Sequence, residues 1–111
     1  MGLDLIHISV HGLIRGNHME LGRDPDTGGQ CLYVLELVKA LALDPAVDRV
    51  SLLTRKVSDP KLSPDYARAH EPLGPKSEIV RIDAGPKRYL RKEVLWRHLD
   101  AFIVSTLGYL R

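Results

Sequence analysis

The stretch Pro25-Asp26-Thr27-Gly28-Gly29-Gln30 joins a pair of glycines to a sequence that is typical of a helix start. Thr27 is a good N-cap residue, and Gln30 three positions later completes a Thr-x-x-Gln capping box. Since Gly28 and Gly29 carry no side chain, a ligand can reach the backbone amides that a helix start leaves unpaired. The stretch therefore predicts a phosphate or diphosphate site, although an isolated glycine pair before a helix is also typical of a plain tight turn.

The flanks of this stretch have the patterns of a strand and an amphipathic helix. Residues 3–10 are a β-rich, mostly apolar run of the kind that a buried parallel strand needs. Downstream, Glu36 and Lys39 lie opposite a set of apolar residues at helical spacing, namely Cys31, Val34, Leu35, Val38, Leu41 and Ala42. The predicted order is therefore strand, glycine loop, helix.

The loop between this strand and this helix, residues 11–27, is far longer than the roughly two to six residues usual for such a connection. It leaves the carboxyl end of the first strand, the edge at which open α/β sheets hold their ligands. His11 is expected to line a cleft there because it directly follows the strand. Asp24 and Asp26 could form an acid and base pair, but aspartates before a helix more often bond nearby backbone amides.

The composition is that of one globular domain at most, with 111 residues, 44% of them hydrophobic, and a formal charge of +2. No apolar stretch is long enough for a membrane span and no basic leader opens the chain, so we expect a cytoplasmic location. The charge is too small to imply a nucleic-acid partner. Cys31 stands alone and is expected to be a buried small hydrophobe. The histidines show no metal-ligand spacing: His7, His11, His18, His70 and His98.

The rest of the chain predicts two further strands and a second long helix. Residues 49–55 and 78–84 are β-rich, and the proline-rich residues 56–77 indicate a surface excursion with a short strand or turn near residues 66–72. From about residue 91 to 111, one helical face carries Leu95, Leu99, Phe102, Ile103, Thr106, Leu107 and Leu110. The alternation predicts an α/β fold with a Rossmann-like parallel sheet. Since three strands make a small sheet, the chain looks truncated.

Four motifs together resemble the amino-terminal domain of the sucrose-phosphate synthase family. They are His-Gly-Leu-Ile-Arg-Gly at residues 11–16, the run at residues 20–30, Leu-Leu-Thr-Arg at residues 52–55 and Gly-Pro-Lys at residues 85–87. The resemblance implies a GT-B retaining glycosyltransferase that moves glucose from UDP-glucose to the 2-hydroxyl of fructose 6-phosphate. It implies that residues 1–111 are the first part of the Rossmann-like, acceptor-side domain, and that the carboxyl-terminal nucleotide-sugar domain is absent.

The resemblance also implies roles for particular residues. Gly28 and Gly29 correspond to backbone positions that face the donor diphosphate and the acceptor, and Gln30 corresponds to a residue that contacts the acceptor sugar. Arg88, with Lys87 beside it, falls where the family has a lysine that holds the fructose phosphate. Arginine keeps that charge and adds a bidentate fork suited to phosphate. The family's catalytic groups correspond to no residue here, so the chain alone is expected to be inactive.

Two other functions stay open at this point. Sucrose synthase shares the Pro-Asp-Thr-Gly-Gly-Gln stretch and uses unphosphorylated fructose, whereas residues 11–16 and the Gly-Pro-Lys-Arg turn favour the relative that uses the phosphate. A non-catalytic module that binds a phosphosugar or a protein would need to cover its sheet edge and helix face in a homo-oligomer.

The remaining expectations concern partners and cofactors. The resemblance implies UDP-glucose and fructose 6-phosphate as partners and no cofactor. Stimulation by Mg²⁺ stays open, and no identifiable residue would bind the ion. No nucleic acid or membrane is expected as a partner. The basic residues at positions 87–92 could also be only a solvated turn, which is the ordinary reading of a charged run.

Overall fold

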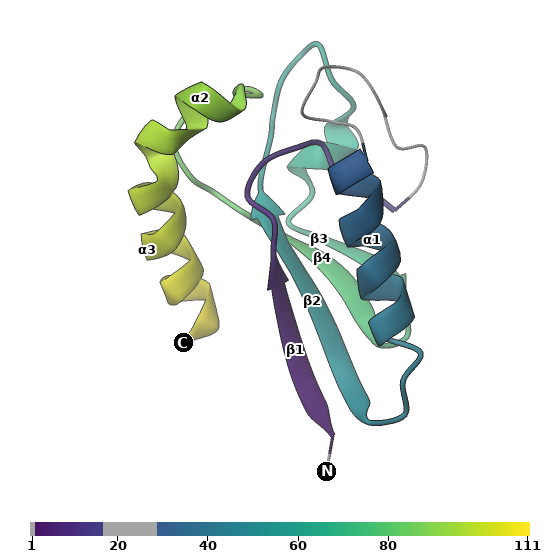
Figure 1. The fold of residues 1–111 in the computed structure, drawn as a ribbon. Coiled ribbons are helices and arrows are strands. Elements are labelled where there is room, and N and C mark those ends of the chain that lie inside the picture. The colour runs from purple at the N-terminus through teal and green to yellow at the C-terminus, as the bar shows by residue number, and fades with distance from the viewer. Residues whose placement is uncertain (1, 17–28) are drawn as a thin grey trace.

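The computed structural model describes residues 2–16 and 29–111 (Figure 1). The chain order is β1 (Leu3–Ile8), α1 (Gly29–Leu41), β2 (Val47–Arg55), η1 (Pro64–Ala67), β3 (His70–Gly74), β4 (Ser77–Ile82), α2 (Lys92–Leu95), η2 (Trp96–His98) and α3 (Leu99–Leu110), where η marks a 3-10 turn. None of these helices is both long and apolar enough to cross a membrane.

The strands form one open sheet in the order β1-β2-β4-β3. β1, β2 and β4 run parallel, and α1 connects the first two, so the predicted βαβ unit is confirmed. The three predicted strands are parallel as expected, and the short strand or turn expected near residues 66–72 overlaps β3, which pairs antiparallel with β4. Only Pro75 and Lys76 separate these two strands, and a parallel connection would need about a dozen residues.

The two long helices pack on opposite faces of the sheet (Figure 1). Leu52 and Leu53 are neighbours on β2 and therefore point to opposite faces. On the α1 face, Leu52 belongs to a cluster with Cys31, Val34, Leu35, Val38, Val50 and Ile79. On the α3 face, Leu53 belongs to a cluster with Val80, Ile82, Ala84 and Phe102. The predicted apolar face of α1 and the burial of Cys31 are thus confirmed.

β1 is an edge strand and not the buried strand that its apolar sequence predicts. Leu3, Ile6 and Ile8 are 56%, 49% and 52% exposed. β1 pairs only with β2, and α3 packs over β2 and β4 instead of over Ile6 and Ile8. The described part of the chain therefore provides this strand with one neighbour and with cover on one face.

The predicted helix at residues 91–111 is divided by η2, where His98 has φ −114° and ψ 9°, outside the helical region. Its predicted apolar face is only partly buried. Leu95, Phe102 and Thr106 are buried, whereas Ile103, Leu107 and Leu110 are exposed.

Candidate binding site at the carboxyl edge of the sheet

Those predicted ligand-binding residues that the structure describes lie at the edge where β1, β2 and β4 end. Since these strands are parallel, the segments that follow them leave from the same edge. α1 runs back from this edge and begins at Gly29, with Gln30 exposed in its first turn. The loop after β4 brings Lys87 and Arg88 to this edge, and both side chains are exposed.

Several predicted residues fall outside the described ranges. They are Gly28, the Thr27 half of the capping box, His18, and the two loop carboxylates Asp24 and Asp26. Among the described residues, no group of three or more His, Cys, Asp or Glu side chains could hold a metal ion.

His11 joins the segment after β1 to the loop after β4. Its Nε2 lies 3.0 Å from the carbonyl oxygen of Leu90 and 3.3 Å from the hydroxyl oxygen of Tyr89. The rings of His11 and Tyr89 are 5.6 Å apart between centroids. A small apolar pocket of about 160 Å³ lies beside His11, between Val10 and α2. His11 therefore lies at this edge and contacts the loop after β4, and its place in a ligand cleft stays a prediction.

The loop between β4 and α2 is held by its backbone. The Arg55 guanidinium donates from one nitrogen to the Pro86 carbonyl oxygen at 2.5 Å and from the other to the Arg88 carbonyl oxygen at 2.7 Å. Between these two contacts, the Lys87 carbonyl oxygen accepts from the Ser58 amide at 2.7 Å. The side chains of Lys87 and Arg88 therefore extend from a fixed main chain.

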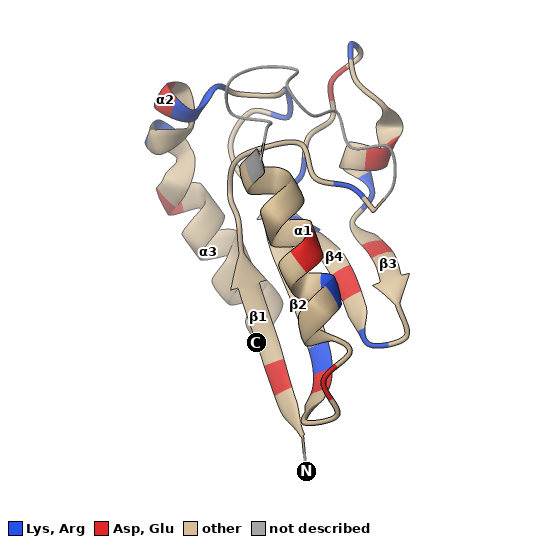
Figure 2. Cartoon of the chain, turned by 45° about the vertical axis from the view of Figure 1, so that its right-hand side comes forward, with Lys and Arg blue, Asp and Glu red and all other residues tan. Residues whose placement is uncertain are grey.

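Arg55 is a buried cation at the end of β2, with only 4% of its surface exposed. Burial lowers the pKa of its guanidinium, and the nearby positive charge of Arg88 acts in the same direction, while Tyr89 opposes both. Arginine nevertheless keeps its charge in proteins. Lys and Arg also follow the chain from this loop into α2 (Figure 2), so the corner is electropositive and suited to an anion.

A second buried arginine holds the segment that follows β1. Arg81 on β4 pairs with Glu71 on β3 at 2.8 Å, with the two side chains 1% and 9% exposed. Arg81 also donates to the Ile14 carbonyl oxygen at 2.8 Å, and the Glu71 carboxylate accepts from the Gly16 amide at 2.6 Å. The network therefore fixes residues 14–16 against the sheet.

Sequence reasoning missed this network and the contacts of Arg55. The available signal was a charged residue in an otherwise apolar strand, Ile79-Val80-Arg81-Ile82. A charge buried in a sheet needs a partner, but nothing in the local pattern identifies Glu71 as that partner.

Gly85 starts the loop after β4 with φ +67°, a conformation that side chains disfavour, and a Cβ there would lie 2.8 Å from the ring of His98. We expect Gly85→Ala to lower the free energy of unfolding by at least about 1 kcal/mol. The control is Gly108→Ala in α3, where an added Cβ meets nothing within 4 Å and helix propensity predicts a gain of up to about 1 kcal/mol. Urea unfolding followed by circular dichroism measures both, and equal midpoints would contradict the strain at Gly85.

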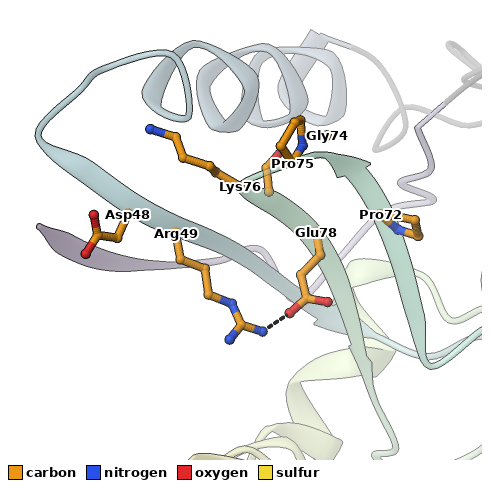
Figure 3. Close-up of a pocket in the computed structure, with 8 residues that line it drawn as sticks. Asp48, Arg49, Pro72, Gly74, Pro75, Lys76 and Glu78 are labelled. Atoms are coloured by element: carbon orange, nitrogen blue, oxygen red, sulfur yellow. Dashed lines mark hydrogen bonds and ion pairs between the residues drawn. The ribbon is translucent and has the colours of Figure 1, made fainter.

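A more polar hollow of about 370 Å³ lies at the opposite end of the sheet (Figure 3). Its charges are already engaged, since Arg49 pairs with Glu78 and Lys76 Nζ donates to the Val47 carbonyl oxygen at 2.5 Å. The hydrogen bond to Glu78 raises the pKa of Arg49. Because the basic groups are already paired with this chain's own oxygens, this hollow is the weaker candidate for an anion.

Comparison with known proteins agrees with the motifs. No protein-family model matches the chain. It is 47% identical to a probable sucrose-phosphate synthase 1 of Craterostigma plantagineum and 46% identical to sucrose-phosphate synthase 1 of Arabidopsis thaliana, in each case over 97% of this chain. The chain spans 12% of the length of each of these relatives.

The fold agrees as well. A solved sucrose-phosphate synthase of Thermosynechococcus elongatus superposes with a TM-score of 0.74 and 30% identity, over 96% of this chain and 24% of that one. The expected fold class, an open α/β sheet like that of a GT-B sucrose-phosphate synthase, is confirmed.

Proposed function

Because the chain is homologous over nearly its whole length to a segment of sucrose-phosphate synthases, we propose that it forms the acceptor side of such a glycosyltransferase. In this proposal the enzyme transfers glucose from UDP-glucose to fructose 6-phosphate with retention, and a nucleotide-sugar domain outside these residues completes the site. The cytoplasmic location expected from the sequence is part of the proposal.

The observation that carries the proposal is the loop of Lys87 and Arg88, which leaves the same edge of the sheet as the start of α1. Both basic side chains are exposed on a fixed backbone, and the helix start offers unpaired amides. A sugar phosphate carries about two negative charges near neutral pH, and each hydrogen bond to a charged group contributes about 1.5–3 kcal/mol. Arg88 and Lys87 are therefore proposed to bind the acceptor phosphate.

The helix start is proposed to act on the donor. In glycosyl transfer the leaving diphosphate gains negative charge as the sugar becomes oxocarbenium-like, so fixed donors near that charge favour the reaction. The amides of Gly28 and Gly29 are proposed for this role, with Gln30 in contact with the acceptor sugar. The amides of a helix start point outward along the axis and require no rearrangement to receive an anion.

Two alternatives make different demands on the same residues. A sucrose synthase would take free fructose and would leave the basic loop without an anion. A phosphosugar-binding or oligomerising module is favoured by the exposed apolar residues of β1 and α3, including Ile6, Ile8 and Ile103.

We expect the chain of 111 residues to bind fructose 6-phosphate in the millimolar range or tighter and free fructose at least about tenfold more weakly, since the charged contacts go to the phosphate. Titration followed by amide NMR tests this, with the largest shifts expected at Lys87, Arg88 and Gln30. Equal affinity for the two sugars would favour the sucrose synthase alternative. Shifts confined to the hollow of Figure 3 would contradict the site itself.

We also expect the same chain to form no sucrose 6-phosphate from UDP-glucose and fructose 6-phosphate, because the relatives are about eightfold longer, the chain being 12% of their length, and glycosyl transfer needs donors on both sides of the leaving group. Chromatographic assay of the product measures this, with a sucrose-phosphate synthase of full length as the positive control. Product above background would contradict the assignment of the acceptor side alone.

A further inference from the structure

Arg55 lies at the end of β2, and its guanidinium donates hydrogen bonds to backbone carbonyl oxygens of the proposed phosphate loop. We propose that Arg55 is a positioning residue, which sets the affinity for the phosphorylated sugar by holding the main chain of residues 86–88 in the shape that directs Lys87 and Arg88 outward. This inference rests on the proposed function for the identity of the ligand. The clamp itself rests on contacts within this chain.

The first support is the pairing of a single guanidinium with two carbonyl groups. Its two terminal nitrogens donate to the carbonyl oxygens of Pro86 and Arg88, at 2.5 and 2.7 Å. The rigid planar fork of arginine fixes the distance between these oxygens, which lie two residues apart, and so fixes the turn between them. Lysine, with a single point of charge on a flexible stem, cannot hold both oxygens in this way.

The second support is that the same short segment after β2 holds the rest of the loop. The Ser58 amide donates to the Lys87 carbonyl oxygen at 2.7 Å, and the Asp59 carboxylate accepts from the Tyr89 amide at 3.3 Å. Four consecutive residues of the loop are thereby bonded to residues 55–59. Each of residues 86–89 in the loop after β4 therefore has a hydrogen bond to the end of β2 or to the residues that follow it.

The third support is electrostatic. Arg55 is buried, and its described hydrogen bonds go to neutral carbonyl groups. Burial is the main cause that lowers the pKa of Arg55, and the positive charge of Arg88 acts in the same direction, so the two charges repel each other. An anion placed on Arg88 relieves this repulsion, so the phosphate of the sugar and the clamp stabilise each other.

The test compares Arg55→Lys with Arg49→Lys, a matched change on the same strand at its exposed, opposite end. We expect Arg55→Lys to weaken binding of fructose 6-phosphate by about tenfold, the effect of one charge-assisted contact, and to leave the affinity for free fructose unchanged. Arg49→Lys should change neither affinity. An equal loss for both sugars would show a merely structural role and would overturn the proposal.

Two further measurements separate the clamp from the ligand. In the Arg88→Ala background, Arg55→Lys should affect the affinity much less, because the main side chain through which it acts is gone and only Lys87 remains; an undiminished effect would overturn the proposal. In the free protein, Arg55→Lys should speed hydrogen exchange at the Ser58 amide by about tenfold or more. An unchanged rate would overturn the clamp.

The exchange rates also keep the two proposals distinguishable. If the unchanged chain does not bind fructose 6-phosphate, the proposed function fails, and the exchange rates still decide whether Arg55 holds the loop. If Arg55→Lys does not fold, the Ser58 amide of the unchanged chain must be protected in the absence of ligand. Exchange there at the rate of an open coil would overturn the proposal.

Discussion

Arg81→Met is expected to lower the free energy of unfolding by about 3–5 kcal/mol, because it leaves the Glu71 carboxylate buried without its ion pair. It also removes the donors to the carbonyl oxygens of Ile14 and Arg68. Methionine fills much of the same volume, so the loss of packing is small. Urea unfolding followed by circular dichroism measures the difference.

The control for this prediction is Arg49→Met. Arg49 also pairs with a glutamate, Glu78 on the neighbouring strand β4, but the Arg49 side chain is 58% exposed. Exposed ion pairs contribute little to stability. We expect no measurable shift in its unfolding midpoint. The paired change Arg81→Met with Glu71→Leu should recover part of the stability, because no charge is then left buried. A similar small effect of all three variants would contradict the importance of the buried pair.

The sequence was sufficient for the elements whose pattern is local. The 3.6-residue period between Cys31 and Ala42 predicted α1 and its buried face, and the apolar runs around Leu52 and Val80 predicted two strands. Since the strands are parallel and joined by a helix, their order alone placed Gly29 and Arg88 at the same edge.

The sequence was insufficient where burial depends on distant neighbours. The apolar residues of β1 indicate a preference for burial, but whether Ile6 and Ile8 are covered depends on which elements pack against them. The pairing of β3 was obscured by Pro72, because proline cannot donate to a strand ladder and is found mainly on edge strands, which β3 is.

The same limit applies to the candidate site. The exposed basic residues could be proposed from the Gly-Pro-Lys-Arg turn, but the groups that hold them could not. Arg55 reaches carbonyl oxygens 31 and 33 residues away, and His11 reaches Leu90, which is 79 residues away. No local sequence pattern predicts either contact, because each side chain bonds a backbone carbonyl oxygen and every residue type carries one.

Arg88→Ala is expected to weaken the binding of fructose 6-phosphate by about 10- to 150-fold, the effect of losing one or more hydrogen bonds between a guanidinium and a phosphate. The variant should leave the structure unchanged, because Arg55 donates to the backbone oxygen of Arg88, which alanine keeps. The loop should therefore keep its shape although the side chain is shortened. Titration by NMR or calorimetry measures the affinity, and free fructose should bind as before.

The controls for this prediction separate the effect of the Arg88 charge on affinity from the effect of its planar geometry. Arg88→Lys keeps the charge and loses the bidentate fork, so it should recover part of the affinity. Lys87→Ala should cost less than Arg88→Ala, because Lys87 is proposed only as the neighbour of the main phosphate ligand. Rising salt should weaken the binding of fructose 6-phosphate to the unchanged chain more than to Arg88→Ala, since ions screen the charge of Arg88, which the variant lacks. If Arg88→Ala binds fructose 6-phosphate as tightly as the unchanged chain, the phosphate does not lie at this loop, and an acceptor without phosphate becomes the better hypothesis.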